Sequence, residues 1–266
     1  MKEICIITGA SRGLGYALAK HFVKKGDNVA ICSRNFEEIK KTAKNLKKIN
    51  CNSTILYKEV DVSSEKQVKQ FISYIIRKTY LVKICINNAG IYGPLGKIEE
   101  ICSEGWMHCI DVNLMGPFYF MKAIIPHMKK NKYGKIINLS GGGATAPLPN
   151  ISAYAASKAG LVRLSESLAL ECKEYNIDIN CVAPGLLKTK LYDEIIEAGP
   201  KVVGKAFYNK LKKQQKTPPS VGVELCDWLT SKESDGITGR IISAVWDDYR
   251  NFKDLSNDIY TLRRII

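Results

Sequence analysis

A tyrosine and a lysine four residues apart are the side chains of this sequence best suited to moving a proton. Tyr154 and Lys158 stand in the run S-A-Y-A-A-S-K, and on a helix this spacing places both side chains on one face. A tyrosine has a pKa of about 10 and is a weak base at neutral pH, but a neighbouring ammonium group favours the phenolate and lowers that pKa. Such a pair also occurs by chance in many helices, so its meaning depends on the rest of the chain.

The glycines near the amino terminus form a second motif. Residues 3–7 are mostly apolar and lead directly into T-G-A-S-R-G-L-G and then a helical pattern. Gly9 allows a tight turn, Gly13 lets backbone approach a pyrophosphate, and Gly15 permits close packing of helix on strand. The start of the helix adds free N–H groups and a partial positive charge. The motif therefore predicts a dinucleotide site.

The residues after the second expected strand indicate which dinucleotide binds. A free ribose 2′-OH is usually held by an acidic residue about twenty positions after the glycines. This chain instead has Ser33, Arg34 and an asparagine there, with no acid before Glu37. Arg34 and Arg12 can form a fork on a 2′-phosphate, a group that guanidinium geometry suits. We therefore predict NADP(H), with NAD(H) as the alternative.

Further polar motifs stand where other expected strands end. N-N-A-G occupies 87–90, Ser140 precedes three glycines, and P-G-L-L-K-T occupies 184–189. A further asparagine, Asn113, falls within a long helical pattern. Each motif alone is typical of turns or helix caps. Together they predict one functional rim, because the carboxyl ends of parallel strands meet at one edge of a sheet.

Short apolar runs alternate with helical patterns along the whole chain. The apolar strands do not alternate in polarity, which indicates burial on both faces, and strand–helix alternation predicts right-handed βαβ units. We expect an α/β fold: a doubly wound Rossmann-type three-layer sandwich with a mostly parallel seven-stranded sheet, in one domain over 1–266. The expected strands are 3–7, 28–32, 54–59, 82–87, 134–140, 176–182 and 240–245, and the expected helices 13–25, 35–49, 64–79, 106–130, 152–174 and 219–231.

Two segments break this rhythm. Segment 185–218 is rich in glycine and proline, with a helical piece near 189–198. Long irregular stretches at the carboxyl end of a strand often cover ligands, so we expect a substrate-binding lid. The tail 246–266 carries several aromatic residues. It either packs on its own domain or covers a neighbouring subunit.

Composition excludes several classes of protein. The chain has 266 residues, of which 45% are hydrophobic and 25% charged, as in globular proteins. It has no signal-peptide pattern and no apolar run of membrane-spanning length, so we expect a cytoplasmic protein with no membrane partner. Nine cysteines without a C-x-x-C pair and three scattered histidines predict free thiols and no metal site. The net charge of +14 is best explained by solvated lysines.

The motifs T-G-x-x-x-G-x-G, N-N-A-G and Y-x-x-x-K, in this order, resemble the short-chain dehydrogenase/reductase family. The resemblance covers residues 1–245, and glycines at 9, 13 and 15 match its single-domain form rather than the extended epimerase form. It implies an oxidoreductase that interconverts a carbonyl and a secondary alcohol. It also implies a homodimer or homotetramer that packs the helices of 106–130 and 152–174.

The resemblance assigns roles to matching residues. Tyr154 is the implied general acid in reduction and base in oxidation. Lys158 is implied to lower the pKa of that tyrosine and bind the nicotinamide ribose, and Asn113 to hold a water that relays protons. The implied cofactor-binding set is Gly9, Ser11, Arg12, Gly13, Leu14, Gly15, Ser33, Arg34, Asp61, Val62, Asn87, Ala89, Gly90, Tyr154, Lys158, Pro184, Gly185 and Thr189.

One position departs from the family pattern. Members usually carry a serine thirteen residues before the tyrosine, which donates a hydrogen bond to the substrate oxygen, but this chain has Gly141 there. Either Ser140 serves instead, or the donor is missing or comes from elsewhere, such as Thr145. We favour Ser140 as the fourth catalytic residue.

Three functions remain in competition. We favour an NADP(H)-dependent oxidoreductase acting on a small carbonyl or alcohol. A catalytically weak dinucleotide-binding sensor or scaffold is the alternative, and a nucleic-acid-binding protein that uses the lysine faces is the least favoured. Lys188, Lys190 and Lys201 weakly favour an anionic substrate, although solvated lid lysines are the simpler explanation.

Overall fold

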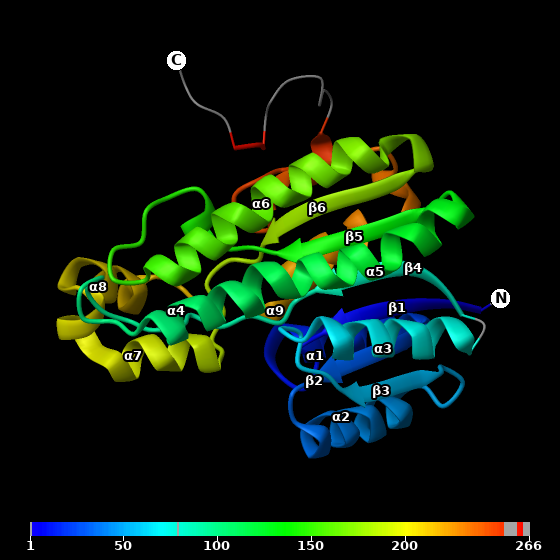
Figure 1. Ribbon diagram of the computed structural model, residues 1–266, viewed down its shortest axis with the longest axis horizontal. Helices are drawn as coiled ribbons and strands as arrows, with labels where there is room; N and C mark the ends of the chain where they lie inside the picture. The colour runs from blue at the N-terminus through cyan, green and yellow to red at the C-terminus, as the bar shows by residue number, and fades with distance from the viewer. Residues whose placement is uncertain (1, 79, 253–259, 263–266) are drawn as a thin grey trace.

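The computed structural model describes residues 2–78, 80–252 and 260–262. Strands and helices alternate through most of this part of the chain (Figure 1). The strands are β1 (Lys2–Thr8), β2 (Asn28–Ser33), β3 (Ile55–Glu59), β4 (Tyr80–Asn87), β5 (Gly134–Leu139), β6 (Ile177–Ala183) and β7 (Ile241–Ser243). The helices are α1 (Gly13–Lys25), α2 (Phe36–Ile49), α3 (Glu65–Arg77), α4 (Ser103–Ile110), α5 (Gly116–Asn131), α6 (Ser152–Cys172), α7 (Lys190–Val203), α8 (Lys205–Lys213) and α9 (Pro219–Leu229).

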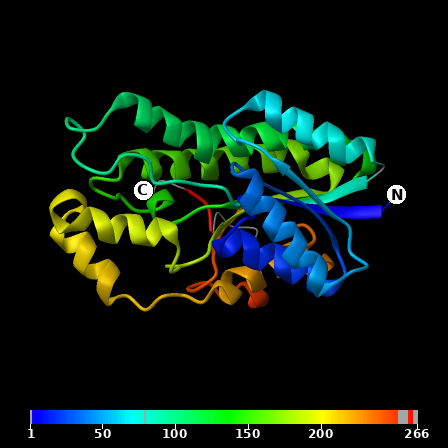
Figure 2. The same cartoon turned by 90° about the horizontal axis from the view of Figure 1, so that it is seen from below.

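The seven strands form one parallel sheet in the order β3-β2-β1-β4-β5-β6-β7. Chain order runs outward in one direction from β1 to β3 and in the other from β4 to β7. The order therefore reverses between β1 and β4, where a doubly wound sheet opens a crevice at its carboxyl edge. Helices cover both faces, which gives three layers (Figure 2). The expected doubly wound Rossmann-type sandwich is confirmed.

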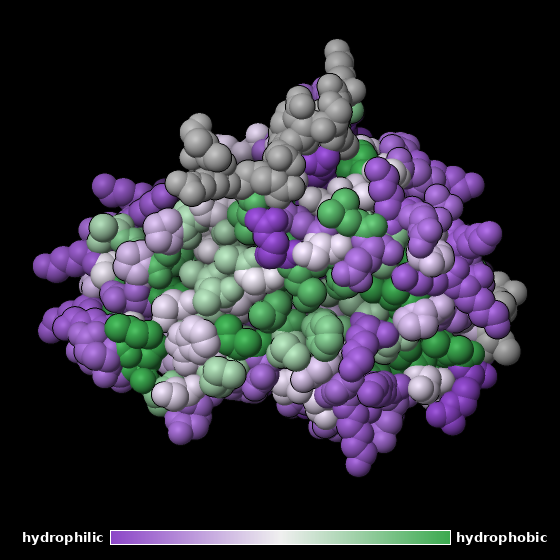
Figure 3. All heavy atoms as spheres, turned by 45° about the horizontal axis from the view of Figure 1, so that its top comes forward, coloured by the Kyte–Doolittle hydropathy of each residue, from purple (hydrophilic) through white to green (hydrophobic). Residues whose placement is uncertain are grey.

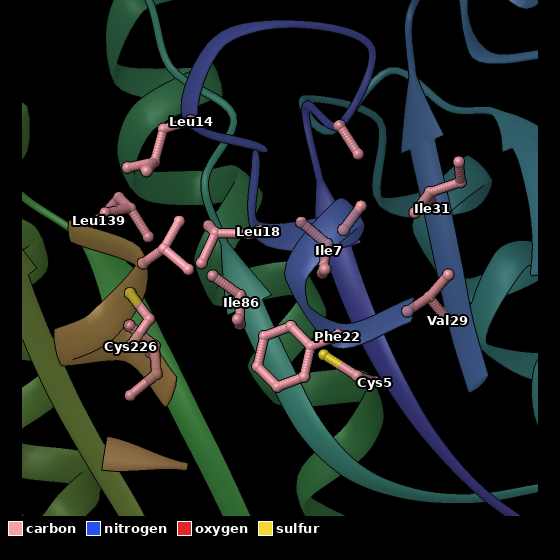
Figure 4. Packing of buried hydrophobic residues seen from close by; sticks show 14 of the residues in the cluster. Cys5, Ile7, Leu14, Leu18, Phe22, Val29, Ile31, Ile86, Leu139 and Cys226 are labelled. Atoms are coloured by element: carbon pink, nitrogen blue, oxygen red, sulfur yellow. The ribbon is translucent and has the colours of Figure 1, made fainter. Parts of the chain in front are cut away.

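Alternate residues of each strand enter the two halves of the core, as a pleated strand dictates. From β1, Cys5 and Ile7 pack beneath α1, α2 and α9, in the cluster shown in Figure 4. Ile4 and Ile6 point to the opposite face and join the cluster under α3, α5 and α6. Burial on both faces explains the continuous apolar runs of the strands.

The side of the molecule that carries α5 and α6 has an apolar band across its middle, bordered by hydrophilic side chains (Figure 3). Leu170 on α6 is 77% exposed and Met107 on α4 is 51% exposed. Leucine and methionine are usually buried, so these positions are candidates for contact with another molecule.

The expected helix over 106–130 is present, but it is not α-helical throughout. The chain forms α4, then a π-helical turn over Asp111–Met115, and then α5. Pro117 explains the break, because proline has no N–H and cannot donate to the carbonyl of Asn113 four residues earlier. The amide of Gly116 reaches back to the carbonyl of Asp111 instead, which is a π-type hydrogen bond.

The expected lid contains more helix than its composition indicates. Instead of one helical piece near 189–198, the chain forms α7 and α8. Gly199 (φ 76°) and Pro200 kink α7, and Gly204 (φ 87°) separates the two helices. The glycines and prolines therefore shape corners between short helices rather than an irregular loop. In Figures 1 and 2, this pair of helices lies beyond the carboxyl ends of the strands.

Part of the tail packs on its own chain. The amide of Ile241 donates to the carbonyl of Tyr260 (2.7 Å), and the amide of Leu262 donates to Glu166 (2.7 Å). Residues 260–262 therefore lie against β7 and α6. Of the other residues expected in the tail, 246–252 are described, whereas 253–259 and 263–266 fall outside the described residues.

A buried ion cluster lies at the amino ends of β5 and β6. The ammonium of Lys135 is fully buried and contacts Asp178 (2.7 Å) and Asp235 (2.8 Å). Asp178 also accepts a hydrogen bond from the amide of Gly236 (3.1 Å). Removing one partner of a buried charge is costly, because the remaining charge stays desolvated.

We expect Asp178→Ala to lower the free energy of unfolding by about 3 kcal/mol, as measured by urea denaturation. Lys97→Ala is the matched control, since Lys97 and Glu100 form an exposed pair (3.3 Å) and its loss should cost no more than about 0.5 kcal/mol. Equal stability of Asp178→Ala and the parent would contradict this account.

Candidate active site

The glycine turn after β1 is tied to the end of β4. The hydroxyl of Thr8 accepts hydrogen bonds from the amides of Asn88 and Ala89 (both 3.0 Å). The side-chain amide of Asn88 donates to the carbonyl of Thr8 (2.9 Å) and to that of Gly9 (3.3 Å). These bonds bridge the two strands at the point where the sheet order reverses, and so they fix both walls of the crevice.

The glycines are required by backbone shape and by close contacts. Gly9 and Gly13 have φ values of 63° and 56°, which side-chain-bearing residues rarely adopt. A Cβ at Gly15 would overlap the carbonyl of Gly9 and lie 2.5 Å from Asn88 Nδ2. The helix α1 begins after this turn without a side-chain cap, so its first N–H groups are available to an anion.

A cleft of about 1750 Å³ runs from this turn to the lid. Of the expected cofactor-binding residues, those that line it are Gly9, Ser11, Arg12, Gly13, Leu14, Ser33, Arg34, Val62, Ala89, Gly90, Tyr154, Lys158, Pro184, Gly185 and Thr189. Gly15, Asp61 and Asn87 are not among the lining residues. Gly15 packs against Gly9, Asp61 accepts hydrogen bonds from the amide (3.0 Å) and hydroxyl (2.7 Å) of Ser63, and Asn87 bonds to Asn138 (2.8 Å).

Two arginines and one glutamate lie at the end of the cleft beyond β2. Arg12 is 3.9 Å from Glu38, and both side chains are about half exposed. The amide of Glu38 is held by Asn35, which caps the start of α2 (2.9 Å). Arg34 is exposed and lines the same part of the cleft. Guanidinium groups therefore outnumber carboxylates here by two to one.

Tyr154 and Lys158 stand one helical turn apart near the start of α6, and both line the cleft. The ammonium of Lys158 lies 5.7 Å from the centre of the Tyr154 ring and donates to the carbonyl of Leu139 (2.6 Å). Burial lowers the pKa of Lys158 to about 8. The lysine is therefore an ammonium at neutral pH and loses its charge above pH 8.

The pKa of Tyr154 differs from the sequence-based expectation. Burial raises it, with smaller electrostatic contributions from Tyr92 and Cys109. The expected lowering depends on the lysine together with an oxidised nicotinamide; in the chain by itself, desolvation of the hydroxyl dominates and the net pKa is raised. Tyr154 holds its proton firmly at neutral pH.

Asn113 connects the segment after β4 to α6. Its side chain lies in the π-helical turn, accepts from the amide of Ile91 (2.9 Å) and donates to the carbonyl of Ile91 (2.8 Å). It also donates to the hydroxyl of Ser157 (3.0 Å), which in turn donates to the carbonyl of Tyr154 (2.7 Å). Sequence reasoning missed Ser157, although it stands between Tyr154 and Lys158 in the motif.

The residues after β5 carry the departure from the family pattern. Gly141 lies directly beneath the Tyr154 hydroxyl, because a Cβ built on it would overlap that oxygen. The Ser140 side chain is buried, and its hydroxyl has no hydrogen-bond partner in the described part of the chain. Ser140, Gly141 and Thr145 all line the cleft.

The lid forms a small apolar core that includes the tyrosine. Ile195 and Val203 of α7, Leu211 of α8 and Ile151 are buried together, with Tyr154 and other partly buried side chains around them. The two ends of the lid are joined by a hydrogen bond from the amide of residue 217 to the carbonyl of residue 186 (2.7 Å).

One further aromatic residue, Tyr92, packs on the Tyr154 ring with 4.8 Å between ring centres. Sequence reasoning missed it, and its only signal is its place just after N-N-A-G.

Other kinds of site lack support in the described residues. Among them, no group of three or more histidine, cysteine, aspartate or glutamate side chains is arranged to hold a metal ion. No helix in the same part of the chain has both the length and the apolarity needed to span a membrane. The candidate site thus consists of one cleft that is lined by the uncapped start of α1 and by Tyr154 and Lys158.

A doubly wound sheet with a glycine turn at its switch point defines the class of nucleotide-binding α/β proteins. The family model described as short chain dehydrogenase matches residues 3–199. An L-fucose dehydrogenase of Oryctolagus cuniculus is 30% identical over 199 residues, which cover 74% of this chain and 67% of that protein. A 3-oxoacyl-(acyl-carrier-protein) reductase of Chlamydia muridarum is 30% identical over 251 residues, with 91% and 96% covered. The chain belongs to the short-chain dehydrogenase/reductase family of oxidoreductases.

Solved structures support the fold. The chain superposes on NAD+-bound xylitol dehydrogenase with a TM-score of 0.82 at 23% identity, covering 91% of this chain and 96% of that one. It also superposes on a variant of actinorhodin polyketide ketoreductase with NADPH, with a TM-score of 0.82 at 23% identity, covering 91% and 95%. Similar folds thus hold either dinucleotide.

The contact between Gly141 and Tyr154 gives a direct test of this geometry. Gly141→Ala should lower the free energy of unfolding by about 1–3 kcal/mol, because the added methyl displaces the tyrosine. Gly142→Ala is the matched control, since a Cβ there meets no atom within 4 Å. Urea denaturation measures both variants, and equal stabilities would show that the tyrosine hydroxyl does not rest on Gly141.

Proposed function

We propose that this chain is an NADP(H)-dependent oxidoreductase that interconverts a carbonyl and a secondary alcohol, with Tyr154, Lys158, Asn113 and Ser140 as its catalytic set. The observation that carries the proposal is that Tyr154, Lys158 and the uncapped start of α1 all line the same cleft. An anion-binding helix end and a proton donor are thereby available to the two ends of one bound dinucleotide.

The residues present fit a nicotinamide dinucleotide. Turn residues 9–14 would hold the pyrophosphate at the start of α1, Val62 the adenine, and Ala89 and Gly90 the ribose side, whereas Asp61 and Asn87 lie outside the cleft lining. Pro184, Gly185 and Thr189 would hold the nicotinamide end, and Thr189 already lies 3.5 Å from a Cβ built on Gly13. A bound nicotinamide supplies the hydride in reduction and accepts it in oxidation.

The proton steps belong to the chain's own residues. In reduction, Tyr154 donates its proton to the carbonyl oxygen, and its raised pKa keeps that proton available at neutral pH. In oxidation, the same hydroxyl must lose its proton first, and positive charge beside it favours that loss. Lys158 supplies one such charge as long as it remains an ammonium.

Asn113 would serve a relay through its backbone. Pro117 cannot donate to the carbonyl of Asn113, so that carbonyl lacks its α-helical partner, and we propose that it holds a water that relays protons from Lys158. Ser140 would donate a hydrogen bond to the substrate oxygen, and its unpartnered hydroxyl supports this role. The lid over 185–218 would enclose the substrate.

NADP(H) is proposed over NAD(H) because Arg12 and Arg34 line the cleft end beyond β2. Glu38 lies beside Arg12 and would weaken this preference, since a carboxylate repels a phosphate.

The remaining proposals concern assembly and location. We propose one domain and a homodimer or homotetramer packed through α4–α6, supported by the apolar band in Figure 3 and the exposed Leu170. We also propose a cytoplasmic protein without nucleic-acid or membrane partners.

The second candidate function, a catalytically weak dinucleotide sensor or scaffold, is favoured by one observation, the missing side chain at Gly141.

Turnover tests the proposed reaction. The parent should reduce at least one of acetophenone, cyclohexanone and ethyl acetoacetate with NADPH, and Tyr154→Phe should lower kcat by roughly 10²-fold or more, because the proton donor is lost. Loss of NADPH absorbance measures both. A Tyr154→Phe variant that binds NADPH and turns over like the parent would contradict the catalytic assignment, and a parent that binds NADPH without turnover would favour the sensor.

Steady-state kinetics with both cofactors tests the arginines. Arg34→Asp should raise KM for NADPH by roughly tenfold or more and change KM for NADH little, since only the former carries a 2′-phosphate. Arg77→Asp, at the end of α3 and outside the cleft lining, controls for the change in net charge. A parent that prefers NADH, with a preference that Arg34→Asp does not alter, would refute the NADP(H) assignment.

A further inference from the structure

A second tyrosine shares the cleft wall with the proposed proton donor. The ring centres of Tyr92 and Tyr154 lie 4.8 Å apart with their planes inclined by 60°, and both residues line the cleft. Both also belong to the apolar cluster of the lid. The two phenol rings therefore pack against each other along one stretch of the cleft wall.

The backbone that carries Tyr92 is held on both sides. Asn113 binds the amide and the carbonyl of Ile91 (2.9 and 2.8 Å), and the thiol of Cys109 donates to the carbonyl of Tyr92 (3.4 Å). Gly93 follows with φ 73°, and a Cβ there would lie 2.6 Å from that of Cys109. The π-helical turn that carries Asn113 and the end of α4 that carries Cys109 therefore hold the backbone on both sides of the Tyr92 side chain.

The hydroxyl of Tyr92 is free to donate. It forms no hydrogen bond with another residue in the described ranges. Burial, together with the nearby carboxylate of Glu194 on α7, raises the pKa of Tyr92 to about 12. The group therefore keeps its proton throughout the neutral range, and it can donate a hydrogen bond without acting as a base.

The segment after β5 carries the other proposed donor to the substrate oxygen, Ser140. Gly141 has no side chain to offer, and the Tyr154 hydroxyl rests on its backbone. Ser140 is 5% exposed, whereas Tyr92 is partly exposed and lines the same cleft as Tyr154. Tyr92 is therefore the more accessible of these two hydroxyl-bearing residues.

We propose that Tyr92 is a further catalytic residue, whose hydroxyl donates a hydrogen bond to the substrate oxygen beside Tyr154. The inference rests on the proposed oxidoreductase function. In reduction, the carbonyl carbon gains the hydride and the oxygen gains the proton of Tyr154, while Tyr92 keeps its own proton and stabilises the negative charge that develops on the oxygen. The balance of the reaction is unchanged.

The test is Tyr92→Phe, which keeps the ring packing and removes only the hydroxyl. Ketone reduction is followed with NADPH and the three ketones named above, beside Tyr154→Phe and Ser140→Ala. Tyr74→Phe is the matched control, because Tyr74 lies on α3 and is 36% exposed. Removal of one such donor typically lowers kcat by about 10²–10³-fold. We expect a loss of that size in kcat for Tyr92→Phe, with KM for NADPH and the urea unfolding midpoint as in the parent.

The outcomes separate this inference from the function on which it rests. If the parent is active and Tyr154→Phe is not, but Tyr92→Phe has a kcat within about threefold of the parent, the inference fails and the proposed function stands. It also fails if Tyr92→Phe changes KM for NADPH or the unfolding midpoint as much as kcat, because the residue would then be structural. A parent that turns over none of the ketones overturns both.

Discussion

The hydrogen bonds of one buried asparagine, Asn113, connect the segment after β4 to the helix α6 that carries Tyr154. One set fixes Ile91 after the end of β4, and the other reaches Tyr154 through Ser157 on α6. Ile91 follows the strand that borders the crevice between β1 and β4, whereas Tyr154 belongs to a helix that packs beside β5 and β6. The ammonium of Lys158, which donates to the carbonyl of Leu139 at the end of β5, ties the same helix to the sheet. The π-helical turn lets the Asn113 side chain reach the backbone of Ile91 and the hydroxyl of Ser157 at once.

Burial, rather than charge, dominates the protonation of the tyrosine–lysine pair. Desolvation disfavours the charged form of each group, and therefore it raises the pKa of Tyr154 while it lowers that of Lys158 to about 8. At neutral pH the pair thus consists of a protonated phenol and an ammonium, which is the state that carbonyl reduction requires. Oxidation requires the phenolate and so depends on positive charge brought next to the hydroxyl. The chain by itself is accordingly poised for proton donation.

Sequence patterns predict what depends on local chemistry and miss what depends on contacts between distant segments. The apolar runs predicted all seven strands to within two residues at each end, because strands buried on both faces leave a strong local signal. The break of the helix at Asn113 was missed, although Gly116 and Pro117 are a visible signal within it. The role of Gly141 as a seat for Tyr154 could not be predicted, since it depends on how α6 lies over the end of β5. Tyr92 was missed for the same reason.

The helices of segment 185–218 and Tyr154 share one small apolar core. Ile195, Val203 and Leu211 bury themselves against side chains that also surround Tyr154. Burial raises the pKa of the Tyr154 hydroxyl, and these side chains are part of the apolar surroundings of its ring. The segment rich in glycine and proline therefore contributes to the environment of Tyr154 as well as to the wall of the cleft. Substitutions in this segment would have to preserve the apolar contact to leave the packing of Tyr154 unchanged.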